Sequence, residues 1–134
     1  MENCYASSQN TRCENVFDGV TDRITNYWST ELYDRNPWIK IDLKAKSHVK
    51  KIVIVQPKVD IFKKINNITL QFSDQRKMNY TLRNSVSGSF VHGDITLSDT
   101  KAINLRISIS DEIADKSSYA ITEVQLLGCP AIER

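Results

Sequence analysis

Aliphatic and polar residues alternate along several stretches of the chain. From Ala102 to Ser110, every second residue is Ile or Leu, and the residues between them are polar. Successive side chains of a β-strand point to opposite faces, so this spacing places the four aliphatic side chains on one face of a strand. The same alternation, or a run of β-branched residues, predicts strands over 39–43, 51–55, 68–72 and 121–127, with weaker candidates over 80–83, 90–92 and 95–97.

Turn-forming residues such as Asp18-Gly19 and Gly88 separate these stretches. No segment keeps a helical period over more than about ten residues, although 111–118 has room for one short helical turn. Several short strands joined by turns in a small chain predict an all-β sandwich or barrel. Trp28 and Trp38 lie next to strand-like segments, and we expect both to pack in the core.

The composition fits one folded domain. Of the 134 residues, 40% are hydrophobic and 25% are charged, and we expect a single domain over 1–134 with an ordered core over about 4–129. The 18 basic and 16 acidic residues leave a net charge of only +2, which gives no reason to expect a nucleic-acid partner. No apolar run approaches the roughly 18 residues of a membrane-spanning helix. The segment 128–134 has the pattern of a strand end followed by a linker, so we expect a module excised from a larger extracellular protein.

Three cysteines and two glycosylation patterns bear on where the protein works. Three cysteines cannot all pair within one chain, and their spacings match no zinc-binding pattern. The acceptor pattern Asn-x-Thr begins at Asn67 and again at Asn79, and we predict glycosylation at both. Together these features favour an extracellular protein, either secreted or on a cell surface.

The loop over 15–30 is rich in oxygen-bearing side chains. Calcium takes about six to eight oxygen ligands, many of them backbone carbonyls of irregular loops. Asp18 and Asp22 offer carboxylates in this loop, and Thr25 and Asn26 offer neutral oxygens. The pattern is also that of a simple turn in which Asp18 hydrogen-bonds its own backbone, and both interpretations stay open at this point.

The order of several motifs resembles the discoidin, or coagulation-factor type C, domain superfamily. These motifs are Ala6-Ser7-Ser8, Asn15-Val16-Phe17-Asp18-Gly19, Tyr27-Trp28-Ser29-Thr30 and Pro37-Trp38-Ile39-Lys40-Ile41-Asp42-Leu43, followed by strand-like segments over 49–55, 68–73 and 121–129. The resemblance covers the chain from Cys4 to Cys129, and around Asn36-Pro37-Trp38 it is greatest to the fucose-binding, or F-type, lectin branch. It implies a galactose-binding-like jelly-roll β-sandwich of about eight antiparallel strands.

The lectin branch and many bacterial carbohydrate-binding relatives hold a structural calcium ion, so the resemblance implies calcium as a cofactor here. The ligands that it implies are loop carbonyls, one hydroxyl or amide oxygen and two carboxylates. The carbonyls are those of Asn15, Val20 and Thr122, the neutral side-chain oxygen is that of Asn26 (or Thr25), and the carboxylates are those of Asp18 and Glu123. The coagulation-factor branch generally lacks this ion, so the resemblance leaves both possibilities.

The fucose lectins bind their sugar with a His and with an Arg-x-Asp motif that is followed by a second basic residue. Lys58, Asp60 and Lys64 stand at the three positions of that motif, but no His stands at the family's position. Lysine also lacks the planar fork of arginine, so the resemblance does not indicate fucose as the ligand. The residues that we expect to form a ligand-binding surface are Tyr33, Arg35, Lys58, Asp60, Phe62 and Lys64.

The resemblance also implies a disulfide. In the family, a cysteine before the first strand commonly pairs with one after the last strand, and here these are Cys4 and Cys129. This pairing leaves Cys13 without a partner in the chain. A Cys4–Cys13 bridge is the competing possibility.

These patterns predict a noncatalytic extracellular recognition module that binds a cell-surface glycan or glycoprotein through its end loops. We expect no enzymatic activity, because no hydrolase, phosphate-loop or metalloprotease motif occurs. One alternative is a protein–protein adhesion module with a decayed sugar site, which fits the missing His and the Lys-for-Arg positions. A second alternative is attachment to phospholipid through Ile61-Phe62, an apolar pair beside the basic Lys63-Lys64.

Overall fold

A computed structural model describes residues 3–9, 11–17, 27–31, 34, 36–58, 62–73, 77–111 and 118–130. This part of the chain is built almost entirely of β-strands, and all the strand pairings in it are antiparallel. The elements are β1 (Asn3–Ala6), the 3-10 helix η1 (Cys13–Phe17), β2 (Trp28–Ser29), β3 (Trp38–Pro57), β4 (Asn67–Phe72), β5 (Lys77–Thr81), β6 (Arg83–Ser87), β7 (Phe90–Ile109), β8 (Ala120–Ile121) and β9 (Glu123–Pro130). The all-β expectation is confirmed. Across these described ranges, no helix is long and apolar enough to cross a membrane.

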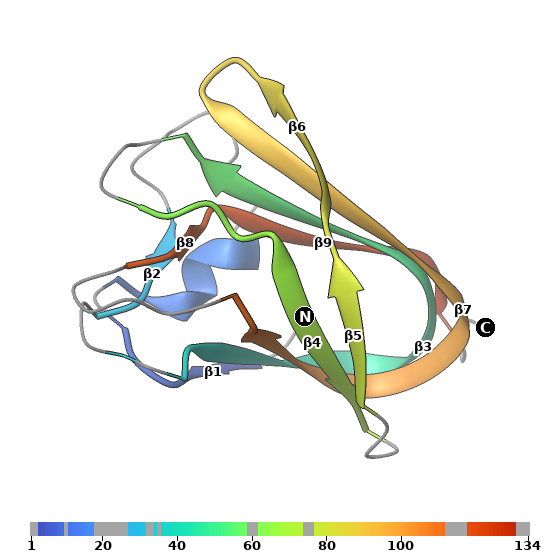
Figure 1. Cartoon of the computed structure of the whole chain (residues 1–134). Coiled ribbons are helices and arrows are strands. Elements are labelled where there is room, and N and C mark those ends of the chain that lie inside the picture. The colour runs from blue at the N-terminus through green and yellow to red at the C-terminus, as the bar shows by residue number, and fades with distance from the viewer. Residues whose placement is uncertain are drawn as a thin grey trace.

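Two strands of 20 residues each, β3 and β7, form the centre of the fold. They pair with each other along most of their length, with register shifts between Asp42 and Ser47 and between Val49 and Lys51. Both strands bend sharply in the same region, on the right of Figure 1. The sequence predicts two strands where β3 runs and three where β7 runs, because the polar residues at the bend interrupt the alternation.

Because β3 and β7 bend, each contributes to both layers of a sandwich. The first half of β3 and the second half of β7 pair with β1 and β4, and β5 extends this layer beyond β4. The second half of β3 and the first half of β7 pair with β9 and β6 in the other layer (Figure 1). Fully buried side chains fill the space between the layers, the largest of them being Trp28, Tyr119, Phe72, Ile39, Ile41, Ile52, Ile54, Ile65, Ile68, Leu70, Leu105 and Ile107.

The end of the sandwich where β3 ends and β7 begins is formed by short strands and by a break between β8 and β9. The predicted strand over 121–127 is interrupted at Thr122, so β8 pairs with β2 while β9 pairs with β3. The Thr122 N–H donates to the Val55 carbonyl at 2.7 Å, which fixes this break against β3. At the same end, Gly88 has a φ of 61° in the two-residue turn between β6 and β7, a conformation that glycine adopts without steric cost. The predicted helical turn over 111–118 lies for its greater part outside the described residues.

The two tryptophans differ in burial. Trp28 is fully buried, as expected, and its indole N–H donates to the Ser8 carbonyl at 2.9 Å. The expectation of a core position for Trp38 is wrong. Its neighbour Ile39 points into the core, so the alternation of the strand turns Trp38 to the outer face. The Arg106 guanidinium lies 4.3 Å from the centre of the Trp38 ring and covers it there.

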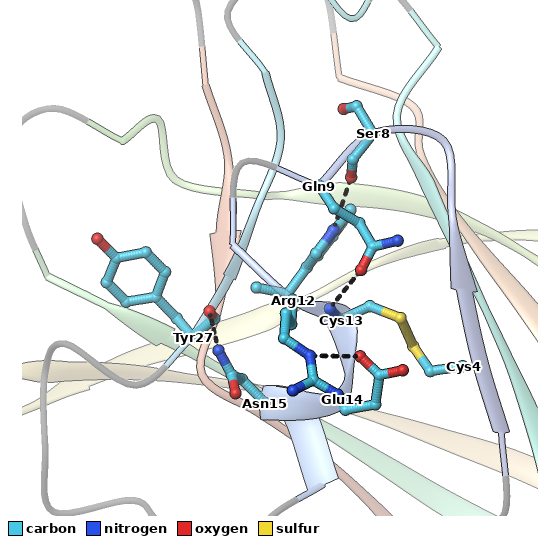
Figure 2. Close-up of a disulfide and its surroundings, with 9 residues drawn as sticks. Cys4, Ser8, Gln9, Arg12, Cys13, Glu14, Asn15 and Tyr27 are labelled. Carbon is cyan, nitrogen blue, oxygen red and sulfur yellow. Dashed lines mark hydrogen bonds and ion pairs between the residues drawn. A yellow bond between two sulfur atoms is a disulfide. The ribbon is translucent and has the colours of Figure 1, made fainter.

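The predicted Cys4–Cys129 disulfide is also wrong, because Cys4 is bonded to Cys13 with their Cα atoms 6.1 Å apart (Figure 2). On β3, Cys4 stands opposite Ile41 and Cys129 stands opposite His48. The bend of β3 lies between these two positions, so β1 and β9 pair with β3 on opposite sides of the bend and in different layers of the sandwich. Helix η1 packs beside β1 and brings the first residue of the helix to Cys4.

Candidate functional site

A hollow of about 250 Å³ lies at the end of the sandwich where β3 ends and β7 begins. We call it the end pocket. It is lined by Gln56, Pro57, Lys58, Phe62, Lys63, Lys64, Val86, Val91 and Ala120, which come from the end of β3, the following segment, the β6–β7 hairpin and β8. Three residues of the expected ligand-binding surface, Lys58, Phe62 and Lys64, meet here. The other three, Tyr33, Arg35 and Asp60, lie outside the described residues.

The segment that carries these side chains is fixed through its backbone. The Lys58 N–H donates to the Ser89 carbonyl at 2.8 Å, and the Lys63 N–H donates to the Ser118 carbonyl at 2.9 Å. The segment therefore hydrogen-bonds to the β6–β7 turn at its start and to the residues before β8 further on.

The buried Gln56 side chain holds the end of the same segment. Its Oε1 accepts the Ile65 N–H at 2.7 Å, and its Nε2 donates to the Ile65 carbonyl at 3.2 Å. Gln56 is 3% exposed and Ile65 is fully buried, so both bonds are shielded from water. Lys58, Lys63 and Ile65 are thus each held by hydrogen bonds to neighbouring parts of the sandwich.

The chemistry of the end pocket is cationic and apolar. Lys58, Lys63 and Lys64 are exposed, and none of the described lining residues is acidic. Phe62 and Val86 supply apolar surface between them, and Val86 is 57% exposed. Ammonium groups donate hydrogen bonds to hydroxyl or carboxylate oxygens, while apolar side chains cover the C–H faces of a ligand.

Phe62 is half-buried rather than freely exposed. Its ring meets the Tyr27 ring edge-on, with ring centres 5.1 Å apart and planes at 75°. A residue that inserts into a lipid bilayer must offer its apolar side chain to the membrane, whereas this one is packed against its own chain. The other member of the predicted lipid-binding pair, Ile61, lies outside the described residues.

Three of the six expected calcium ligands lie in the described residues, and the structure brings their elements together. Asn15 is in η1, which packs against β9, and its Nδ2 donates to the Tyr27 carbonyl at 2.9 Å (Figure 2). Tyr27 precedes Trp28, which pairs with Ile121, the residue before Thr122 and Glu123. Asp18, Val20 and Asn26 lie outside the described residues, as does the alternative Thr25.

Thr122 and Glu123 are both buried, with exposed fractions of 0% and 7%. The Thr122 Oγ1 has no hydrogen-bond partner in the described part of the chain. A buried carboxylate such as that of Glu123 requires donors or a cation to offset its desolvation. Buried oxygens of these types fit a hard cation such as calcium. Among the described residues, no three His, Cys, Asp or Glu side chains form a metal-binding group.

The two predicted glycosylation acceptors lie opposite each other's threonines. Asn67 is paired with Thr81, and Asn79 is paired with Thr69. The Thr81 hydroxyl donates to the Asn67 Oδ1 at 2.9 Å, and the Thr69 hydroxyl donates to the Asn79 Oδ1 at 2.7 Å. Both asparagines are exposed, so their position is compatible with glycosylation, which stays a prediction.

Sequence reasoning missed the residues that complete the end pocket from other strands. Val86, Val91 and Ala120 reach it from β6, β7 and β8. The sequence signal for Val86 is its place two residues before Gly88, because a residue next to a hairpin turn lies at an end of the sandwich.

Comparison with known proteins places this fold in a family. Residues 15–107 match the model of the NedA-like, galactose-binding domain of the coagulation factor 5/8 type C group. This match spans more than half of the chain, so the chain belongs to that family, and the resemblance to the discoidin superfamily is confirmed. No curated protein sequence matches the chain.

Solved structures share the fold at low sequence identity. The family 32 carbohydrate-binding module of C. perfringens NanJ, in complex with galactose, has a TM-score of 0.71 at 15% identity and covers 92% of this chain and 91% of its own. The lectin domain of lectinolysin, complexed with Lewis B antigen, has a TM-score of 0.68 at 14% identity, covering 94% and 92%. Chitosan-binding module 1 of a Paenibacillus sp. IK-5 chitosanase/glucanase has a TM-score of 0.65 at 18% identity, covering 94% of each chain.

Proposed function

We propose that the protein is a noncatalytic recognition module that binds a carbohydrate in the end pocket. The observation that carries this proposal is the meeting of Lys58, Phe62 and Lys64 around one hollow of about 250 Å³. A sugar offers both hydroxyl oxygens and an apolar C–H face, and the pocket offers ammonium donors beside an aromatic ring. The similar solved structures were determined with galactose and with Lewis B antigen bound, which supports the same class of ligand here.

The residues have separate roles in this proposal. The Lys58 and Lys64 ammonium groups donate to sugar hydroxyls, and Phe62 covers one C–H face. Tyr27 holds the Phe62 ring through their edge-on contact. A glycan with a carboxylate is favoured over its neutral counterpart, because the described lining has three lysines and no acidic side chain.

We further propose that the protein holds a structural calcium ion beside the end pocket. Asn15, Thr122 and Glu123 would hold it together with Asp18, Val20 and Asn26. The ion would supply positive charge that offsets the buried Glu123 carboxylate. Asn15 is hydrogen-bonded to the Tyr27 carbonyl, and the Tyr27 ring contacts Phe62. An ion bound at Asn15 would therefore also help to hold Phe62 in the end pocket.

We propose an extracellular location for the module, secreted or at a cell surface. The Cys4–Cys13 disulfide supports it, because disulfides persist in oxidising compartments and are rare in the cytosol.

A glycan array probed in calcium and in chelator tests the carbohydrate proposal. We expect binding in calcium. Calorimetry should show at least a tenfold rise in Kd for Phe62→Ala and for Lys64→Ala, because truncation of a central contact residue commonly costs about 1.4 kcal/mol of binding free energy. Lys50→Ala is the matched control, because Lys50 is an exposed lysine near the bend in the middle of β3, away from the end pocket. A folded protein that binds no glycan in either buffer refutes the proposal and favours the adhesion alternative.

Thermal unfolding tests the calcium proposal. We expect the wild type to melt at a higher temperature in calcium than in chelator, since a ligand of the folded state stabilises it. Glu123→Gln removes this difference. Glu14→Gln keeps it, because Glu14 lies in η1 with a partly exposed side chain that pairs with Arg12 (Figure 2). Equal melting temperatures of the wild type in the two buffers refute the calcium site.

A further inference from the structure

One row of side chains crosses five strands on the outer face of the layer that contains β1, β4 and β5. The strand register places its members opposite one another, in the order Tyr5 on β1, Lys40 on β3, Arg106 on β7, Gln71 on β4 and Lys77 on β5. We call these five residues the cationic row. Buried residues flank the three central members, namely Ile39 and Ile41 beside Lys40, Leu70 and Phe72 beside Gln71, and Leu105 and Ile107 beside Arg106, so the row points outward.

The charges of the cationic row are not balanced within it. Three of its five members are cations, and Lys40 and Arg106 stand directly opposite each other. Like charges at such positions destabilise a sheet. The ion pairs between described residues join Arg12 to Glu14, and Lys51 and Arg83 to Asp94, and none includes a member of the row. Asp42 lies two residues after Lys40 on the same face of β3 and is paired with Asn104, so it is not a member of the row.

The Arg106 side chain is held against the Trp38 ring and lies between two hollows. Its guanidinium lies over the Trp38 ring at 4.3 Å, which fixes the plane of its N–H donors. Its Nε is buried and has no hydrogen-bond partner in the described part of the chain. One hollow, of about 200 Å³, includes Lys40 and Asn104, and the other, of about 400 Å³, includes Trp38 and Ser108. Arg106 lines both.

The length of the row indicates the kind of anion that fits it. Strands lie about 4.8 Å apart, so the three strand spacings from Lys40 to Lys77 span about 14 Å. A single small anion cannot contact both ends. A linear chain with repeated acid groups can, and its hydroxyls can bond to the neutral Asn104 and Ser108 side chains beside the row.

We propose that the cationic row binds a linear acidic polysaccharide, one whose repeating sugars carry sulfate or carboxylate groups. Arg106 binds one acid group with its fixed N–H donors, and Lys40 and Lys77 bind neighbouring groups as point charges. Single-stranded nucleic acids stack successive bases on several aromatic rings. Along the row, Arg106 covers the Trp38 ring, which leaves the half-exposed Tyr5 at one end as a single ring beside Lys40.

This site is separate from the end pocket. The row uses the first half of β3 and the second half of β7, whereas the pocket uses the end of β3 and the start of β7. The two proposals can therefore fail independently.

The test measures binding of four immobilised polymers: dextran sulfate, polygalacturonate, unsubstituted dextran and oligo-dT. The protein is produced without N-glycans, because Asn67 and Asn79 share the face of the row. We expect binding to dextran sulfate, to polygalacturonate or to both at 0.15 M salt, and no binding to dextran. The first two polymers distinguish sulfate from carboxylate as the acid group. Binding should be lost in 1 M salt, where charges are screened within about 3 Å.

Lys40→Ala, Lys77→Ala and Arg106→Gln should each weaken binding about tenfold, the cost of one charge-assisted hydrogen bond. Lys77 is exposed on β5, so its variant folds even if Arg106→Gln does not. Lys101→Ala is the matched control, because Lys101 is an exposed lysine of β7 near the bend, and we expect a change below twofold.

Several results overturn the proposal. One is no binding to either acidic polymer, and another is an equal loss of affinity for Lys77→Ala and Lys101→Ala. A third is abolition of binding by Lys58→Ala or Lys64→Ala, because the ligand would then occupy the end pocket. Binding of oligo-dT as tight as that of the polysaccharides overturns the assignment to a carbohydrate.

Discussion

Replacing Gln56 by leucine tests whether the buried amide holds the lining of the end pocket. Gln56→Leu keeps the side chain's approximate size and removes both of its hydrogen bonds to Ile65. The Ile65 carbonyl retains a second donor, the Asn84 Nδ2 at 3.0 Å. The Ile65 N–H has no other partner among the bonds of the described residues, so the substitution leaves a buried donor unsatisfied.

The expected loss of stability follows from these two bonds. An unsatisfied buried donor costs about 1–3 kcal/mol, and loss of the weaker bond to a carbonyl that keeps another donor adds about 1 kcal/mol. We therefore expect Gln56→Leu to lower the free energy of unfolding by about 2–4 kcal/mol. For a domain of this size, that corresponds to a fall of about 10 °C in Tm.

Urea unfolding monitored by tryptophan fluorescence measures this loss, with calorimetry for Tm. Gln125→Leu is the matched control, because Gln125 is exposed on β9, and it should change stability by less than about 0.5 kcal/mol. If Gln56→Leu costs no more than the control, the reasoning is refuted, because the pocket segment then does not depend on the buried amide.

Three further predictions concern stability. Cys13→Ser opens the disulfide, whose sequence separation is 9, and should cost about 2–3 kcal/mol of unfolding free energy by chain entropy; urea unfolding that leaves the wild-type value unchanged contradicts this. Gly128→Ala brings a Cβ onto the His48 carbonyl of the neighbouring strand and should cost about 1–3 kcal/mol in the same assay. The Arg83 side chain lowers the pKa of Asp94 through a hydrogen bond, so their contact stabilises the fold above the unfolded pKa, near 4, and the stabilisation is lost as the pH falls through the folded pKa. Asp94→Asn should accordingly flatten the pH dependence of Tm between pH 5 and pH 2, and an unchanged slope would rule this contact out as its source.

The sequence is most informative where one physical effect acts alone. The alternation over 102–110 predicts a strand with one apolar face. Leu105, Ile107 and Ile109 of β7 are buried as expected, whereas Ile103 is 44% exposed. Alternation cannot tell whether two strand-like segments are one bent strand, because a bend needs polar residues just as a loop does. The alternation therefore predicts two separate strands over 39–43 and 51–55, although the single strand β3 runs through both.

The expectations for Trp38 and for Cys4 were wrong for different reasons. The alternation with the buried Ile39 already puts Trp38 on the outer face, where Arg106 covers its ring, so the size of the side chain was the wrong guide. For Cys4, the family pattern implied Cys129, but the stagger of β1 and β9 along β3 separates those two strands. No local pattern contains that stagger.

The candidate site was predictable only in its central segment. Lys58, Phe62 and Lys64 stand close together in the chain, so a family motif could identify them. The residues that complete the pocket, such as Val86 and Ala120, come from strands that are distant in sequence and meet only in the folded sandwich.

The two long strands have a consequence for how this protein folds. The first half of β3 pairs with β1, which precedes it by more than 30 residues, and its second half pairs with β9, where Val49 meets Gly128. Among the strand pairings of the described residues, the β4–β5 and β6–β7 hairpins are the ones between near neighbours. Domains dominated by such distant pairings fold in milliseconds to seconds, because long loops must close before the contacts that stabilise them exist. Until β9 arrives, one edge of the second half of β3 exposes unpaired backbone, and this edge is where we expect the folding chain to aggregate.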